Sequence, residues 1–350
     1  MPDGQPPAIM HVTEPAWELT QRASRRTFLK RATLVAGTSA TIMGTCHARI
    51  LADEPDQPSA TQPGGSPPRD GVATGCIDAH SHIWTSDVQS YPLAAGFTPA
   101  DMQPASFTPE QLLAHARPCG VDRVVLIQMS YYGFDNRYML AAMRATPGTF
   151  SGVAVIDEHG PRVRETMRDL KRQGVRGFRI HPGTRDVSNW LFDDAMTSMW
   201  KTGADEQLAM CALVNPEALV PLDRMCERFP DTRLVIDHFA RIGVNGMLRE
   251  ADIDNLCRLA RHRQTYLKTS AFYALGKKAA PYADLGPMIQ RLLGAFGRER
   301  LMWASDCPFQ VEEGHTYRDS IELVRSRLDF LSADDRSWLL RKSAERVFFG

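Results

Sequence analysis

The chain has 350 residues, with 41 Lys and Arg against 41 Asp and Glu, so its formal net charge is zero. Because no basic stripe with interleaved aromatic residues is present, the sequence argues against nucleic acid as a partner. The seven cysteines are scattered without a C-x-x-C pair, and their odd number argues against a disulfide framework. We therefore expect buried free thiols.

The first residues have the pattern of an export signal. Residues 24–30 read Ser-Arg-Arg-Thr-Phe-Leu-Lys, and an uncharged run over 32–46 follows, with candidate cleavage positions near Ala48 and Ala52. The run is shorter than the roughly 20 apolar residues of a membrane span. A basic amphipathic helix is the alternative. The pattern resembles a twin-arginine (Tat) signal peptide over 1–52, which implies export by the Tat machinery, a periplasmic or otherwise exported protein, and no stable membrane span in its mature form.

Residues 53–74 are rich in Pro, Gly, Ser, Asp and Gln. Such a composition cannot bury enough apolar surface to offset the entropy of ordering the backbone. We therefore predict a disordered linker over 53–74 and one folded domain over 75–350, close to the ~250 residues typical of an eight-stranded α/β barrel.

Within this domain, short apolar runs alternate with helical patterns, which is typical of parallel βα units. The candidate strands are Cys76–Ala79, Arg123–Ile127, Gly152–Ile156, Val175–Ile180, Leu208–Val214, Arg233–Asp237, Tyr266–Thr269 and Leu301–Ala304. One candidate helix begins after Thr108, which forms a capping box with Gln111. Further candidate helices cover Pro161–Lys171, Pro216–Phe229, Met247–Arg261, Pro287–Phe296 and Tyr317–Leu331. Two closing helices are expected, capped by Ser332 and Ser343.

A doubly wound open sheet would also fit eight strands that alternate with helices, so the positions of the polar residues decide between the two folds. Polar side chains stand at or just beyond the ends of most candidate strands, where barrel enzymes collect their catalytic groups. They are His80, His82, His181, Asn215, His238, Ser270 and Asp306. The sequence therefore predicts an α/β protein with a (β/α)₈ TIM barrel.

The strongest motif is Asp78-Ala79-His80-Ser81-His82. Residues two apart on a strand project to the same face, about 6.6 Å apart, so both imidazoles can reach one ion or one substrate atom. Asp306 follows an apolar strand, which would place its carboxylate in a partly desolvated mouth where it can accept a proton from water.

These motifs resemble the amidohydrolase superfamily, and within it the amidohydrolase 2 branch of lactonases and decarboxylases. The similarity extends over residues 75–350 and includes the His80/His82 pair, Val235-Ile236-Asp237-His238, Leu267-Lys268-Thr269-Ser270 and Trp303-Ala304-Ser305-Asp306-Cys307-Pro308. It implies that the paired histidines and the final aspartate form the metal or substrate centre, with His238 beside them.

The chain departs from the metal-dependent members of that branch because no histidine follows strand five, which ends in Val214-Asn215. The remaining donors, His80, His82, His238 and Asp306, would still suit a divalent ion such as zinc. The resemblance to metal-free lactonases leaves the alternative that the same residues act by hydrogen bonding with no cofactor.

Substrate contacts are expected on several strand ends. Arg241, three residues after His238, matches an arginine that holds a substrate carboxylate in the related lactonases, and Arg179 is a second candidate, since guanidinium pairs with carboxylates through two bonds. His181 and Asn215 are further candidates. The arginine that those lactonases carry after strand seven is absent here, which favours a neutral or monoanionic small molecule.

We therefore expect an exported hydrolase that opens a lactone, a similar cyclic ester or an amide. Asp306 would activate water, helped by a histidine-bound metal if one is present, and His238 would stabilise the oxyanion or bind that metal. Two alternatives stay open: a non-oxidative decarboxylase of the same branch, and an exported binding protein without catalytic activity. The sequence gives no indication of the oligomeric state.

Overall fold

The computed structural model describes residues 75–183 and 186–350. The predicted signal peptide and linker, 1–52 and 53–74, lie outside the described residues. Within the described residues no helix is long and apolar enough to cross a membrane.

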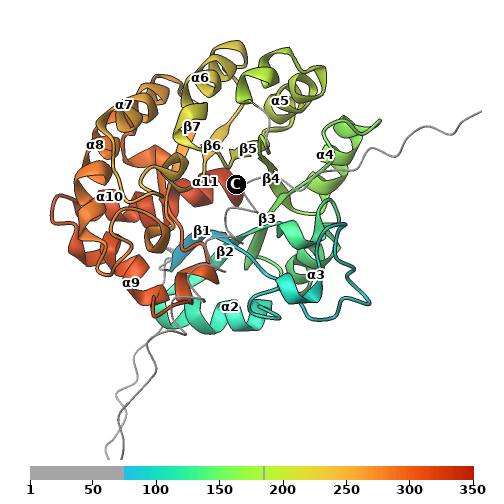
Figure 1. Cartoon of the computed structure of the whole chain (residues 1–350), viewed down its shortest axis with the longest axis horizontal. Coiled ribbons are helices and arrows are strands. Elements are labelled where there is room, and N and C mark those ends of the chain that lie inside the picture. Colours follow the sequence, from blue (N-terminus) through green and yellow to red (C-terminus); the bar gives the residue numbers. More distant parts are fainter. Residues whose placement is uncertain (1–74, 184–185) are drawn as a thin grey trace, which may run out of the picture. The chain divides into compact units, whose positions relative to one another are not determined.

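Eight parallel strands pair in sequence order, each with the next. They are β1 (Cys76–Ser81), β2 (Val121–Ile127), β3 (Phe150–Ala154), β4 (Val175–Ile180), β5 (Ala209–Ala212), β6 (Leu234–Ile236), β7 (Thr265–Thr269) and β8 (Leu301–Trp303). The two ends of the sheet meet through a parallel bridge between Ser81 and Cys307, and the backbone N–H of Asp306 donates to the carbonyl of His80 at 2.9 Å. The predicted (β/α)₈ barrel is confirmed (Figure 1).

The helices form an outer ring around the strands, except α11, which lies at the middle of the ring (Figure 1). They are α2 (Pro109–Ala116), α3 (Arg137–Ala145), α4 (Val163–Arg172), α5 (Asp194–Glu206), α6 (Leu219–Arg228), α7 (Glu250–Arg258), α8 (Gly286–Phe296), α9 (Tyr317–Glu322), α10 (Ala333–Ser337) and α11 (Ser343–Phe348). Two π-helical segments, Leu323–Arg327 and Trp338–Lys342, continue α9 and α10.

The helix caps agree with the sequence at two positions and differ at a third. Thr108 and Gln111 form the predicted capping box of α2, and Ser332 caps α10 by accepting from the N–H of Asp335 at 3.1 Å. The prediction that Ser343 caps the last helix is wrong, because the π-helical segment runs into α11 without a break. The Ser343 hydroxyl instead donates to the carbonyl of Arg298 at 3.2 Å.

The last helix fills the centre of the barrel. Val347 and Phe348 of α11 are buried against apolar side chains that point inward from the strands, among them Ile77 and Val125. Figure 1 shows α11 at the middle of the ring of strands. A larger apolar layer packs between the strands and the outer helices. The six cysteines in the described part of the chain are free thiols, as predicted, but the predicted burial holds for only four of them, since Cys76 and Cys257 are partly exposed.

A buried polar cluster joins the first strand to the last. Asp78 of β1 is fully buried and accepts hydrogen bonds from the hydroxyls of Ser81 at 2.8 Å, Ser305 at 2.5 Å and Tyr317 at 2.7 Å. Burial raises the pKa of the Asp78 carboxyl. Because Asp78 bonds residues on both sides of the junction, this cluster holds β1 and β8 in the register that brings His80 beside the loop after β8.

Candidate active site

The two histidines of the first strand lie side by side at the carboxyl end of the barrel. His80 and His82 place their Nε2 atoms 3.2 Å apart. The Nδ1 atom of His82 lies 3.0 Å from the carbonyl of Ile127, and a carbonyl can only accept, so Nδ1 carries the hydrogen. In the neutral ring the lone pair is then on Nε2, which faces the cluster.

Asp306 stands at the centre of the predicted residues. Its Oδ1 atom lies 3.4 Å from Nε2 of His80, 3.4 Å from Nε2 of His82 and 3.7 Å from Nε2 of His238. The hydroxyl of Tyr273 donates to the other oxygen, Oδ2, at 2.7 Å. The structure thus brings His80, His82, His238 and Asp306 together from three strand ends.

The electrostatics of the cluster favour an ionised Asp306 beside neutral His80 and His238. Burial of Asp306 opposes ionisation, but the neighbouring His238 and the pair on β1 outweigh it, so the pKa of Asp306 lies below its ordinary value. Burial lowers the pKa of His238 to about 4 and that of His80 well below 6.5. At neutral pH Asp306 is consequently ionised, which is the form that can accept a proton.

The backbone just after β6 and just after β8 adopts left-handed conformations that non-glycine residues rarely take. His238 to Arg241 have φ values of 50°, 52°, 51° and 58°, and Asp306 has a φ of 65°. Each such residue costs on the order of 1–2 kcal/mol. Strain of this kind persists where surrounding structure enforces it, commonly at functional sites. The left-handed turn carries both His238 and Arg241.

The predicted substrate residues lie on the β4, β5 and β6 side of this cluster. His181 is mostly buried, and its Nδ1 accepts from the N–H of Gly183 at 2.8 Å. Burial, together with the charges of Arg179 and Arg241, lowers the pKa of His181 to about 3. The positive charges of two arginines thus act on His181 and disfavour its protonation.

Two of these residues have partners within the protein. The Arg179 guanidinium lies 3.8 Å from Oδ2 of Asp237, and Asn215 donates to Glu217 at 3.0 Å. The charge of Glu217 in turn acts on Arg241. The structure therefore groups basic side chains near the histidine cluster, whereas Asn215 is turned toward an acidic neighbour.

Three participants were missed at the level of sequence. Lys268 on β7 and Asp237 after β6 are fully buried and form an ion pair with Nζ and Oδ1 2.9 Å apart. Tyr273, which donates to Asp306, comes from the loop after β7. Lys268 and Asp237 stand within two of the motifs that carry the family resemblance, but no role was predicted for either side chain. A lysine among the apolar residues of a strand is a further signal.

The donor set fits a small divalent ion. A tetrahedral zinc site with bonds of about 2.0–2.1 Å places its ligand atoms roughly 3.3–3.4 Å apart. The measured separations from Asp306 to the three imidazoles, 3.4, 3.4 and 3.7 Å, are close to that spacing. His80, His238 and Asp306 lie near enough to share one ion, and His82 adjoins them. This cluster could therefore hold a metal.

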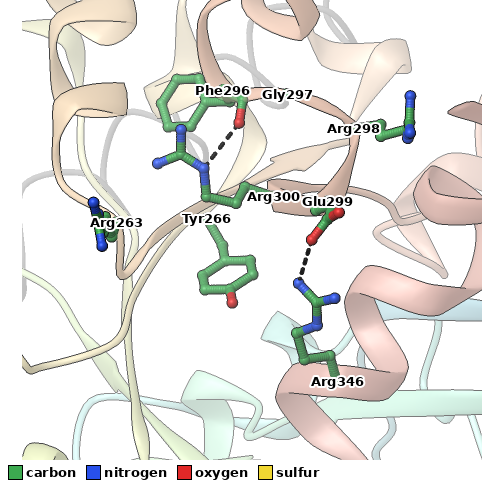
Figure 2. A pocket seen from close by; sticks show the side chains of 8 residues that line it. All are labelled: Arg263, Tyr266, Phe296, Gly297, Arg298, Glu299, Arg300 and Arg346. Carbon is green, nitrogen blue, oxygen red and sulfur yellow. Dashed lines mark hydrogen bonds and ion pairs between the residues drawn. The ribbon is translucent and has the colours of Figure 1, made fainter.

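A pocket lies at the opposite, amino-terminal end of the barrel, and Figure 2 shows its lining residues. Four arginines line it; Arg346 pairs with Glu299 at 2.9 Å, and Arg300 donates to the carbonyl of Phe296 at 2.8 Å. Arg298 pairs with Asp334 at 2.9 Å. Barrel enzymes bind substrates at the carboxyl end of the strands, so we place the active site at the histidine cluster.

A (β/α)₈ barrel with a histidine–aspartate cluster at the carboxyl ends of β1, β6 and β8 defines a class of barrel hydrolases. Comparison with known families agrees, since the Amidohydro_2 model, described as amidohydrolase, matches residues 77–350. The chain belongs to this amidohydrolase family and is an enzyme of the hydrolase type.

Several relatives are named as lactonases or lactone hydrolases, and another as a lactone isomerase. L-fucono-1,5-lactonase of Burkholderia ambifaria is 28% identical over 251 residues, covering 68% of this chain and 82% of the relative. A 2-pyrone-4,6-dicarboxylate hydrolase of Comamonas testosteroni is 26% identical over 269 residues, covering 73% and 84%.

Solved structures share the fold at lower identity. A probable 2-pyrone-4,6-dicarboxylic acid hydrolase of Acinetobacter baumannii, with citric acid bound, has a TM-score of 0.66 at 22% identity, covering 79% of this chain and 100% of the other. An amidohydrolase of Burkholderia multivorans with bound zinc has a TM-score of 0.66 at 20% identity, covering 79% and 99%.

Proposed function

We propose that this protein hydrolyses a lactone or a similar cyclic ester. The observation that carries the proposal is the ionised Asp306 carboxylate, 3.4–3.7 Å from three imidazole nitrogens at the mouth of the barrel. The lactone-hydrolase names of the relatives support the same reaction class. Cyclic esters of sugars or of aromatic breakdown products are the substrates to test first.

In the proposed reaction Asp306 takes a proton from water while the water oxygen bonds to the lactone carbonyl carbon. The ring C–O bond then breaks, and Asp306 returns its proton to the departing alkoxide, so the product is a hydroxy acid. His238 is placed to donate to the carbonyl oxygen as it becomes negative. The hydroxyl of Tyr273 fixes the far oxygen of Asp306 and leaves Oδ1 for the proton transfer.

Because the pKa of Asp306 is low, this carboxylate is a weak base. Proton transfer to it would be easier if the pKa of the attacking water were lowered. A zinc-like ion held by His80, His82, His238 and Asp306 would supply that by lowering the pKa of bound water toward about 7 and polarising the carbonyl. The same residues present hydrogen-bonding groups to the substrate without the ion.

The basic side chains set the substrate's charge in this proposal. Arg241 and Arg179 are assigned to a carboxylate or another anionic oxygen group on the substrate, and His181 to a neighbouring polar group. Tyr273 occupies the region after β7 and adds no positive charge there. A neutral or monoanionic lactone therefore suits the site better than a densely anionic one.

The proposal is tested by incubating purified protein with a panel of sugar lactones and pyrones while following proton release with a pH indicator. We expect at least one neutral or monoanionic lactone to be opened, with one proton released per hydroxy acid formed. Release of carbon dioxide from aromatic acids, with no lactone opened, would identify a decarboxylase instead. Binding of these compounds without turnover would identify a binding protein.

A further inference from the structure

A buried lysine lies directly behind the first histidine of the site, and the proposed reaction does not use it. Nζ of Lys268 is 3.1 Å from Nδ1 of His80 and 2.9 Å from Oδ1 of Asp237. All three side chains are fully buried. The ring of Phe348 closes the space on another side, 5.5 Å from Nζ. The ammonium group is therefore held in a closed chamber between α11 and the histidine cluster.

The contact between Lys268 and His80 determines where the imidazole carries its hydrogen. An ammonium group has three donors and no acceptor, so Nδ1 of His80 must accept, and the hydrogen of the neutral ring is on Nε2. His82 has the opposite arrangement, because its Nδ1 faces the carbonyl of Ile127. The two neighbouring imidazoles thus occupy different tautomers.

The atoms around Nε2 of His80 agree with this assignment. Nε2 lies 3.4 Å from Oδ1 of Asp306, which is an acceptor, and 3.2 Å from Nε2 of His82, which accepts when the His82 ring is neutral. A hydrogen on Nε2 of His80 therefore meets two acceptors. Without that hydrogen, two lone pairs and a carboxylate oxygen would face one another with no proton between them.

A metal ion would require the other tautomer of His80. Coordination through Nε2 uses the lone pair of that atom, so Nδ1 would have to carry the hydrogen and donate it. The acceptor within reach is Oδ1 of Asp237, 3.4 Å from Nδ1, and that oxygen already pairs with Lys268 at 2.9 Å. Lys268 therefore competes with the arrangement that metal binding needs.

We propose that Lys268, anchored by Asp237, is a positioning residue that holds His80 in the Nε2–H tautomer, so that His80 is a hydrogen-bond donor in the metal-free site and metal binding is weakened. The inference concerns the cluster itself and does not depend on which substrate is hydrolysed.

Zinc binding to chelator-treated full-length protein provides the first test, measured by calorimetry for wild type and Lys268→Met. Removal of the ammonium lets Nδ1–H of His80 donate to Asp237, and such outer partners of a metal-bound histidine are worth about 10–100-fold in metal affinity. We expect Lys268→Met to bind zinc at least about tenfold more tightly. Equal or weaker binding by Lys268→Met would overturn the proposal.

Thr269→Val is the matched control for the zinc measurement. Thr269 is the next residue of the same strand, is also fully buried, and its hydroxyl has no hydrogen-bond partner. Its side chain projects from the opposite face of the strand to Lys268. Thr269→Val should therefore keep the wild-type zinc affinity, and a gain as large as that of Lys268→Met would assign the effect to disturbance of β7 and overturn the role of Lys268.

The second test needs only folded wild-type protein. Nitrogen NMR of metal-free protein labelled at histidine distinguishes protonated from unprotonated ring nitrogens, and the His80 signals are assigned by their loss in His80→Gln. We expect a hydrogen on Nε2 and none on Nδ1 in wild type, and the reverse in Lys268→Met. A wild-type His80 with its hydrogen on Nδ1 would overturn the proposal even if Lys268→Met did not fold.

Discussion

At the scale of single residues, the chemistry depends on how neighbours direct each donor and acceptor of the cluster. The motif around His80 and His82 and the final Asp306 could be found in the sequence, because strand ends of a parallel barrel meet at one face. The contacts of Lys268 with His80 and of Tyr273 with Asp306 could not be predicted, because these partners lie 188 and 33 residues apart and only the closed barrel brings them together.

The hydroxyl of Tyr273 gives the first prediction. Tyr273→Phe removes the hydrogen bond to Oδ2 of Asp306, and a bond to a charged group is worth about 1.5–3 kcal/mol. Water at the mouth of the barrel can partly replace this hydrogen bond. We therefore expect kcat to fall by roughly tenfold, which corresponds to the lower end of that range, and KM to change less. Tyr266→Phe, in the pocket at the amino-terminal end of the barrel, serves as control. Unchanged kcat in Tyr273→Phe would show that Asp306 is oriented by other groups.

At the scale of elements, the strand ends carry the site and their junctions decide its geometry. The eight strands were predicted within a few residues because apolar runs in parallel sheets are continuous. The predicted cap at Ser343 is wrong although α11 begins there, because the π-helical segment before it removes the break in the helix. The left-handed turn from His238 to Arg241 also could not be predicted, since its residues are not the glycines that favour positive φ.

The junction of β1 with β8 gives the second prediction. Tyr317→Phe removes a 2.7 Å hydrogen bond to the buried carboxyl of Asp78, so we expect the free energy of unfolding to fall by about 1–3 kcal/mol. Urea unfolding followed by circular dichroism measures the change. Tyr132→Phe removes a hydrogen bond from the backbone N–H of Thr85 and should cost less, about 0.5–1.5 kcal/mol. Equal stabilities of Tyr317→Phe and wild type would contradict a structural role for this cluster.

At the scale of the whole molecule, one folded domain carries the site and its stability depends on the charge state of buried groups. His181 has a folded-state pKa of about 3 against an ordinary value of 6.5. Between these two values the unfolded chain binds more protons than the folded one, so stability is highest above pH 6.5 and falls as the pH is lowered toward 3. Protonation of His181 at acidic pH thus lowers the free energy of unfolding.

This linkage gives the third prediction. A single such histidine contributes a slope of up to about 1.4 kcal/mol per pH unit to the free energy of unfolding. His181→Gln has no proton to take up, so its stability should decline less steeply than that of wild type between pH 6 and pH 4. Urea unfolding at several pH values provides the comparison. Parallel curves for the two proteins would show that His181 does not titrate as described.

The fourth prediction concerns the N-terminal segment, which we propose to be a Tat signal that delivers the enzyme to the periplasm. Its basis is the Arg-Arg pair at 25 and 26 with the uncharged run that follows. Mass spectrometry of protein from the periplasm should find an N-terminus between about Ala48 and Ala52. Replacement of Arg25 and Arg26 by lysine should retain the chain in the cytoplasm. An N-terminus at Met1 on periplasmic protein would contradict the signal.

The measurement that tests the central claim most directly is the turnover of Asp306→Asn on the lactone that wild type opens. An amide keeps the size of the side chain and can still accept from Tyr273, but it cannot take a proton from water. We expect kcat to fall by about 10²–10⁴-fold with no matching rise in KM, since general base catalysis contributes on that order, and circular dichroism should show an unchanged fold. If Asp306→Asn kept more than about half of the wild-type kcat, Asp306 would not be the proton acceptor, and that role would pass to His238 or His181.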